Sequence, residues 1–260
     1  MLHGFAKGAT ILETTNSGEA MQVITLSFFR FKGVSNKLWA FSQMLAARYP
    51  LKRVPDIGFH KLLGSGTREG FHPYPNFGVY GILATWPTLD AARAQIGSAP
   101  VFQRYRDHAV ETCTVYLSAV RCRGQWAGRL PFDVGQEPIE APNQSVAVLT
   151  RATIKPRHIL NFWRQVPDIS ATIRSQDQLQ FKIGLGEVPW LHQVTFTIWE
   201  NKAAMDAFAY RQWHGQAVQA VRAGDWFSEE LFARFRVLHL EGEWEGDHPL
   251  VNHTNDVKND

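Results

Sequence analysis

The two halves of the chain repeat one order of predicted secondary-structure elements, and this repeat restricts the fold more than any other feature. Alternating apolar and polar residues indicate strands, and apolar spacing of three and four indicates helices. The first half predicts strand, helix, strand, strand, helix, strand, over Met21–Phe31, Lys37–Tyr49, Gly58–Leu63, Gly78–Trp86, Leu89–Val110 and Thr114–Arg121. The second half repeats this order over Ser145–Thr153, Arg157–Val166, Leu179–Ile183, Gln193–Trp199, Ala203–Arg222 and Phe232–Leu240.

Matching residues support the equivalence of the halves: Lys61 with Lys182, Trp86 with Trp199, and Gly124-Gln125-Trp126 with Gly242-Glu243-Trp244. A βαββαβ unit forms a four-stranded antiparallel sheet with its helices on one face, so two such sheets can cover each other. The predicted fold class is therefore α+β, with two tandem ferredoxin-like βαββαβ units that form an intramolecular dimeric α/β barrel. The predicted boundaries are a disordered N-terminal extension (1–20), a first half (21–130), a linker rich in proline (131–144), a second half (145–246) and a tail (247–260).

Composition restricts the function classes. Nine tryptophans and 17 phenylalanines permit either a solid core or a wide apolar cavity. The net charge of +3 comes from scattered charges, which gives no support to nucleic-acid binding and leaves a peripheral membrane contact open. The spacing of Cys113 and Cys122 fits neither a Cys-x-x-Cys pair nor a disulfide framework, which indicates a reducing compartment. Without a signal peptide or an apolar run of about 18 residues, we expect a cytoplasmic protein with no transmembrane segment, in contact at most with the inner membrane surface.

The second predicted helix of each half carries Phe and His six residues apart, Phe102 and His108 in the first half and Phe208 and His214 in the second. Helical spacing places each histidine on the apolar side of its helix. Such a histidine is more often a hydrogen-bonded core residue, and the functional alternative is an axial ligand of haem iron. His214 is the first candidate metal ligand and His108 the second. The residues predicted to bind the cofactor with them are Phe208, Tyr210, Trp213 and Arg211, the last facing a haem propionate.

Other candidates have weaker support. His60 and Lys61 are neighbours on a predicted strand and so face opposite ways, which argues against a joint role. The glycines of Gly64–Gly70 precede no helix, so they indicate a turn and not a phosphate loop. The sequence contains no G-x-S-x-G and no GxGxxG motif.

Several longer segments resemble the spheroidene monooxygenase family, the acyclic carotenoid 2-ketolases. The segments are MQVITLSFFRF, KLWAF, IGFHKLLGSGTREGF, YGILATWP, PVFQRYRDHA, VLTRATIKP, FKIGLGE, WEN, AYR and GDWFSEELFARFR, and they extend over almost the whole chain to Trp244.

The resemblance implies a monooxygenase of carotenoid biosynthesis that hydroxylates and ketolates the terminal region of an acyclic carotenoid such as spheroidene. It implies haem iron as cofactor, dioxygen as co-substrate and reduced ferredoxin as electron donor. It supplies no catalytic residues, so those remain unknown. Two alternatives stay open: an oxygenase of the same barrel fold acting on another hydrophobic or aromatic metabolite, and a non-catalytic module that binds a hydrophobic ligand.

Overall fold

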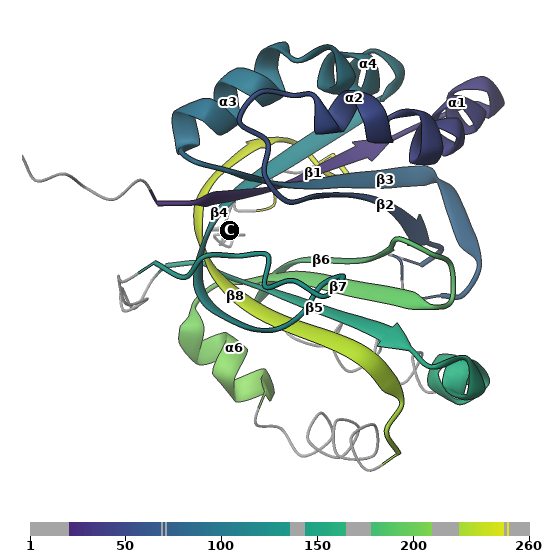
Figure 1. Ribbon diagram of the computed structural model, residues 1–260, viewed down its shortest axis with the longest axis vertical. Coiled ribbons are helices and arrows are strands. Elements are labelled where there is room, and N and C mark those ends of the chain that lie inside the picture. Colours follow the sequence, from purple (N-terminus) through teal and green to yellow (C-terminus); the bar gives the residue numbers. More distant parts are fainter. Residues whose placement is uncertain are drawn as a thin grey trace, which may run out of the picture.

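Eight antiparallel strands close into one barrel in the computed structural model, which describes residues 21–68, 70, 72–135, 144–164, 178–209, 224–246 and 249. The strand order around the barrel is β1-β3-β2-β6-β7-β5-β8-β4, with four neighbouring strands from each half. Helices lie on the outer faces of the sheets, outside the barrel (Figure 1). The predicted pair of fused ferredoxin-like units forming an α/β barrel is therefore confirmed.

The observed elements follow the predicted order. The first half contains β1 Val23–Arg30, α1 Val34–Ala46, α2 Arg48–Lys52, β2 His60–Gly66, β3 Pro75–Trp86, α3 Leu89–Ser98, α4 Pro100–His108 and β4 Glu111–Gly124. The second half contains β5 Val146–Ile154, the short 3-10 helix η1 Pro156–His158 followed by helical residues 159–164, β6 Leu179–Gly186, β7 His192–Trp199, α6 Lys202–Ala209 and β8 Phe227–Gly242.

One predicted helix is wrong, because Leu89–Val110 forms two helices that meet at Ala99 and Pro100. Proline restricts the preceding residue to extended conformations, and Ala99 has φ −64° and ψ 132°. Pro100 then occupies the first position of α4, where its missing N–H removes no helical hydrogen bond.

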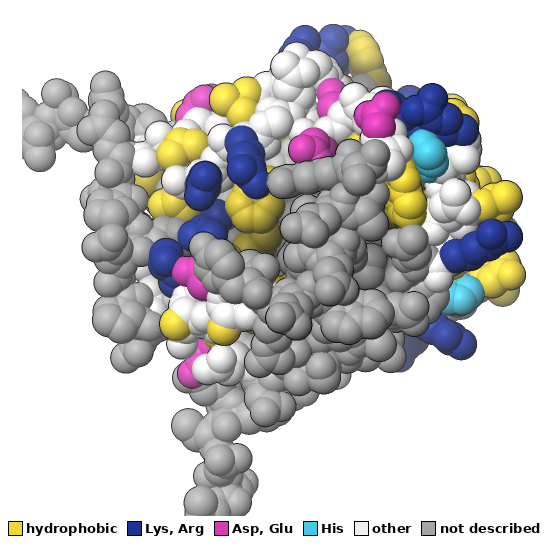
Figure 2. All heavy atoms as spheres, turned by 90° about the horizontal axis from the view of Figure 1, so that it is seen from below, with side chains coloured by type: hydrophobic (Ala, Val, Ile, Leu, Met, Phe, Trp, Pro, Cys, Tyr) yellow, Lys and Arg dark blue, Asp and Glu magenta, His cyan; other side chains and the backbone are white. Residues whose placement is uncertain are grey.

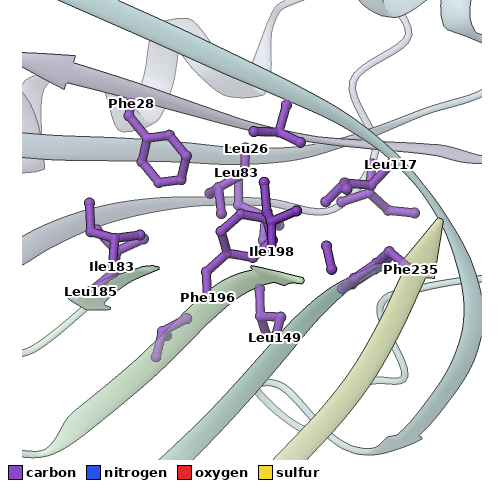
Figure 3. Close-up of a cluster of buried hydrophobic side chains, with 14 of the residues drawn as sticks. Leu26, Phe28, Leu83, Leu117, Leu149, Ile183, Leu185, Phe196, Ile198 and Phe235 are labelled. Atoms are coloured by element: carbon purple, nitrogen blue, oxygen red, sulfur yellow. The ribbon is translucent and has the colours of Figure 1, made fainter. Parts of the chain in front are cut away.

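The interior of the barrel is a packed apolar core, one of the two alternatives that composition left open. Side chains alternate along each strand, so every second residue points inward. Figure 3 shows Leu26, Phe28 and Leu83 of the first half facing Phe196 and Ile198 of the second, and the ring centroids of Phe28 and Phe196 are 6.0 Å apart. Separate apolar clusters fill the space between each sheet and its helices.

Two of the matching sequence markers occupy equivalent places. Trp86 packs against Phe102 on the helix side of the first sheet, and Trp199 stacks on Phe208 on the helix side of the second. Gly124 and Gly242 both have φ near +88°, and a Cβ on either would lie 2.1 Å from a carbonyl oxygen of the facing strand. Each glycine thus allows a tight turn that directs the following Trp126 or Trp244 into the interior core.

The third marker, the pair Lys61 and Lys182, is not equivalent. Lys61 forms an ion pair with Glu187, whereas Lys182 lies between Phe181 and Ile183, which both point into the barrel. Lys182 therefore faces the helices. A shift of one residue along a strand moves a side chain to the other face, so the sequence alignment of these two segments was wrong by one position.

Two seams join the halves, and they differ in length. β4 and β8 pair over eleven positions, whereas β2 and β6 pair only at Gly64 with Gly186 and at Ser65 with Leu185. The predicted extension 1–20 lies outside the described residues, as do most of the predicted linker and tail. Among the helices that are described, none is long and apolar enough to cross a bilayer.

Candidate active site

A pocket of about 240 Å³ lies at the short β2–β6 seam. Its walls come from β2, the β2–β3 connection, the start of β3, α1 and the β6–β7 turn. Most of its lining is apolar, including Phe41, Phe77, Trp163, Leu185 and Trp190. We call this cavity the seam pocket.

Two hydrogen bonds hold the rim of the seam pocket. The Trp163 indole donates to the carbonyl of Trp190 at 3.1 Å, and the Trp190 indole donates to the carbonyl of Pro73 at 2.8 Å. These contacts tie the β6–β7 turn both to the helical segment that follows η1 and to the β2–β3 connection. Residues from both halves therefore build the pocket.

Glycines let the two backbones approach closely at this seam. Gly70 has φ +88°, and a Cβ placed on it would lie 1.8 Å from the carbonyl oxygen of Gly184. Within the second half, a Cβ on Gly186 would lie 2.3 Å from the carbonyl oxygen of His192, so glycine also allows the tight β6–β7 turn. Gly64, Ser65 and Gly66, which the sequence analysis assigned to a turn, instead end strand β2, and together with Gly70 they form one wall of the pocket.

Polar residues form another part of the wall, and Glu187 is the most connected of them. Its carboxylate accepts hydrogen bonds from Lys61 Nζ at 2.6 Å and from Trp126 Nε1 at 2.7 Å. Arg151 lies 3.5 Å from the same carboxylate, and His192 Nδ1 lies 3.4 Å from it. The His192 contact is within ion-pair distance but is not aligned as a hydrogen bond.

A second carboxylate balances the charge of this cluster. Arg151, whose side chain is only 3% exposed, pairs with Glu229 as well as with Glu187. Glu229 also accepts hydrogen bonds from the backbone N–H groups of Ala127 and Gly128, on the connection after β4. The two carboxylates thus neutralise Lys61 and Arg151, as burial of charges in a barrel requires.

The environment keeps Glu187 ionised. Burial alone would raise the pKa of its carboxyl group, but the His192 ring, the hydrogen bonds from Lys61 and Trp126, and the Lys61 charge together lower this pKa to about 2. Glu187 is therefore an acceptor at neutral pH and not a proton donor.

This arrangement suits binding of an apolar group more than acid/base chemistry. Apolar and aromatic walls with a small number of placed polar groups are typical of small-molecule sites. Within the described part of the chain, no group of three or more His, Cys, Asp or Glu side chains is placed to hold a metal ion. A haem iron requires only one axial side chain, so this observation does not test the predicted ligands.

The structure places two of the six predicted site residues. His108 ends α4 and stacks on Trp39, with ring centroids 3.8 Å apart and planes at 5°, and its Nδ1 lies 2.9 Å from the carbonyl oxygen of Arg104. Phe208 lies in α6 and stacks on Trp199 at 5.0 Å. Both residues lie in the helical layers, and neither lines the seam pocket. Tyr210, Arg211, Trp213 and His214 lie outside the described residues, so the axial ligand stays a prediction.

Comparison with known proteins identifies relatives over most of the chain, although no family model matches it. The chain is 46% identical to the spheroidene monooxygenase of Rhodobacter capsulatus over 233 residues, which cover 89% of this chain and 97% of that protein. It is 42% identical to the Cereibacter sphaeroides spheroidene monooxygenase, covering 88% and 71% of the two chains. A third relative, from Rubrivivax gelatinosus, is 33% identical and carries the same name.

Solved structures agree with the fold. A crystal structure of aldoxime dehydratase has a TM-score of 0.56 at 12% identity and covers 85% of this chain and 82% of that chain. A complex of an aldoxime dehydratase with butyraldoxime gives a TM-score of 0.53. At this identity the likeness concerns the fold alone.

The barrel and the relatives together define an oxidoreductase of the monooxygenase class. Within that class, the chain belongs to the spheroidene monooxygenase family, as the resemblance in its sequence indicated.

Proposed function

We propose that this chain is a haem-dependent monooxygenase that uses dioxygen to hydroxylate and then ketolate the terminal region of an acyclic carotenoid such as spheroidene. The seam pocket is the observation that carries this proposal. At roughly 30 Å³ for each water-sized group, a volume of 240 Å³ holds about eight heavy atoms. Such a pocket admits one isoprenoid end of a long polyene and leaves the rest outside, which favours oxidation near the end of the substrate.

The residues of the pocket would bind and shield that end. Leu185, Trp163 and Trp190 provide apolar contact and exclude water from the reacting carbon. His192 and the ionised Glu187 form the polar side, where an introduced hydroxyl group could donate a hydrogen bond to the carboxylate. A site of this kind favours a substrate that enters as a hydrocarbon and becomes more polar as it is oxidised.

The helix side of the second sheet supports the haem part of the proposal. Lys182 and Arg234 face this side, because their neighbours Phe181, Ile183, Ala233 and Phe235 point into the barrel. Arg236 follows the same alternation. Arg234 pairs with the carboxylate of Asp206, so this face accommodates carboxylates such as the two of haem.

The described start of the predicted ligand helix, α6, lies on this same face, since Phe208 stacks on Trp199 and Asp206 lies 3.4 Å from Arg234. His214 would then bind the haem iron, with His108 as the alternative. Arg211 would pair with a propionate, and Tyr210, Trp213 and Phe208 would contact the ring. When bound, haem iron activates dioxygen for insertion into a C–H bond, which side chains alone cannot do.

The overall reaction requires external electrons. Each hydroxylation consumes one dioxygen, two electrons and two protons, and it releases one water. Two hydroxylations of the same carbon give a geminal diol, which loses water to form the ketone. We propose reduced ferredoxin as the electron donor.

The test is an absorption spectrum of protein purified from haem-supplied cells, oxidised and then reduced under carbon monoxide. We expect a Soret band in the wild type and in one of the folded variants His214→Ala and His108→Ala, but not in the other. Turnover of detergent-solubilised spheroidene, followed by mass spectrometry, should slow in Trp190→Ala and not in Trp226→Ala, a tryptophan outside the seam pocket. A wild type that binds no haem would refute the cofactor, and equal turnover by both tryptophan variants would refute the pocket.

A further inference from the structure

Helix α1 exposes an apolar stripe to solvent. Val34, Leu38, Phe41 and Leu45 are spaced by four, three and four residues, which places them on one side of the helix. They are 76%, 63%, 55% and 74% exposed, whereas a surface helix usually buries such a stripe. The side of α1 that faces the sheet buries Ala40 instead.

The stripe continues to the mouth of the seam pocket. Phe41 contacts Phe77 on β3 with ring centroids 5.5 Å apart, and both residues line the pocket. Phe77 and Trp190 are each about half exposed at this rim. We call Val34, Leu38, Phe41, Leu45 and Phe77 the α1 surface. Contiguous exposed apolar residues of this kind mark interaction sites.

Basic residues lie before, within and after α1 in the sequence. Residues 31–55 contain five lysines and arginines and no aspartate or glutamate, and all five basic side chains are exposed: Lys32, Lys37, Arg48, Lys52 and Arg53. The segment therefore carries +5, although the whole chain carries only +3, so the remaining residues sum to −2. Figure 2 views the molecule from the side away from α1, and on this face acidic side chains lie among the basic ones.

We propose that the α1 surface docks on an anionic lipid bilayer and brings the mouth of the seam pocket to the membrane. An apolar stripe flanked by lysine and arginine, with aromatic residues at its edge, is the pattern of helices that lie in the membrane interface. A second copy of the chain is disfavoured as the occupant, because a symmetric contact would place two +5 segments together.

The inference rests on the proposed function for its purpose, since a long apolar substrate dissolves in the bilayer. From the docked position, the substrate end can enter the seam pocket without crossing water.

Sedimentation with lipid vesicles tests the docking without any substrate. We expect the purified holoprotein to bind vesicles that contain phosphatidylglycerol, to bind phosphatidylcholine vesicles more weakly, and to dissociate as salt is added. The double variant Leu38→Glu/Leu45→Glu should lose at least about tenfold in vesicle affinity, because it places two charges on the apolar stripe. Lys37→Glu/Lys52→Glu should lose binding to the anionic vesicles in particular.

The matched control is Leu130→Glu, which alters another exposed leucine, on the connection after β4. It should bind vesicles like the wild type. The proposal is overturned if the wild type does not bind phosphatidylglycerol vesicles, or if Leu38→Glu/Leu45→Glu binds as well as Leu130→Glu. It is also overturned if Leu38→Glu/Leu45→Glu dissociates an oligomer in size-exclusion chromatography, because the occupant would then be a second copy.

Activity measurements separate this inference from the proposed function. With detergent-solubilised spheroidene, Leu38→Glu/Leu45→Glu should keep the wild-type rate, whereas with spheroidene embedded in vesicles it should be slower. A wild type that binds vesicles but oxidises no carotenoid in detergent would refute the proposed function and leave the docking intact. Equal rates of wild type and variant on embedded substrate would overturn the docking.

Discussion

Glu187→Gln is the substitution with the most defined consequence, because one carboxylate holds groups from both halves of the barrel. Gln cannot balance the charges of Lys61 and Arg151, although Arg151 keeps Glu229. Removing one partner from a buried ion pair costs about 3–5 kcal/mol, and the remaining pair reduces this to about 2–3 kcal/mol for Glu187→Gln at pH 7. Urea unfolding of Glu187→Gln, with the exposed Glu200→Gln as control, measures the difference.

The pH dependence provides the sharper check. The pKa of Glu187 is about 2 in the folded protein and 4.5 ordinarily, so the carboxylate stabilises the fold above pH 4.5 and loses this effect as pH falls toward 2. With an allowance for solvent screening, the shift corresponds to about 2 kcal/mol. The stability gap between wild type and Glu187→Gln should therefore be constant from pH 7 to about pH 5 and narrow below pH 4.5. A stability gap that is absent at pH 7, or that does not change with pH, would refute the assignment of Glu187 as the charge that joins the two halves of the barrel.

Three further predictions concern glycine, tryptophan and cysteine. Gly70→Ala should lower the free energy of unfolding by at least about 3 kcal/mol, because it adds a clash with the facing backbone to the strain of positive φ. The control Gly128→Ala, at φ +71° with no atom nearby, should lower it by about 1 kcal/mol. Equal urea midpoints for the two variants would contradict the close approach at the seam. Trp126→Ala should cost about 3–5 kcal/mol by leaving a cavity in the interior core, and a loss under 1 kcal/mol would show that Trp126 does not fill it. Burial raises the pKa of Cys113 to about 12 and raises that of Cys122. A thiol reagent at pH 8 should therefore react slowly with both cysteines until denaturant is added. Fast reaction of one cysteine in the native protein would count against this burial.

The fold could be predicted because the repeat consists of local patterns, namely strand alternation and helical apolar spacing, which do not depend on distant contacts. Alternation identified all eight strands, and apolar spacing of three and four identified the second helix of each half. Phe102 and Phe208 on these helices pack against Trp86 and Trp199. Pro100 was visible in the sequence and should have divided the predicted helix, since its effect on Ala99 is local. Apolar spacing continues across Pro100, so spacing alone predicts one helix there.

The seam pocket could not be predicted, because it depends on which strands meet. The partner of Lys61 is Glu187, 126 residues further along the chain, and strand alternation alone says only that His60 and Lys61 face opposite ways. Local sequence patterns contain no signal for the Trp163–Trp190 contact either. Even so, Lys61 and Leu63 are two residues apart on one strand, so their side chains point to the same side of the sheet. Because Leu63 lies in the barrel core, Lys61 also points into the barrel and requires a buried anion.

The site lies where the two halves stop being equivalent. The paired turns at Gly124 and Gly242 direct one tryptophan each into the interior, which closes the core in the same way in both halves. The connections at the short seam differ, since residues 67–74 join β2 to β3 whereas only residues 187–191 join β6 to β7. The longer connection reaches across to Gly184 and forms a wall of the seam pocket, while the shorter one supplies Glu187 and Trp190. The two equivalent halves thus provide a filled barrel, and the unequal connections at the short seam provide a concave surface on which a hydrophobic substrate can bind.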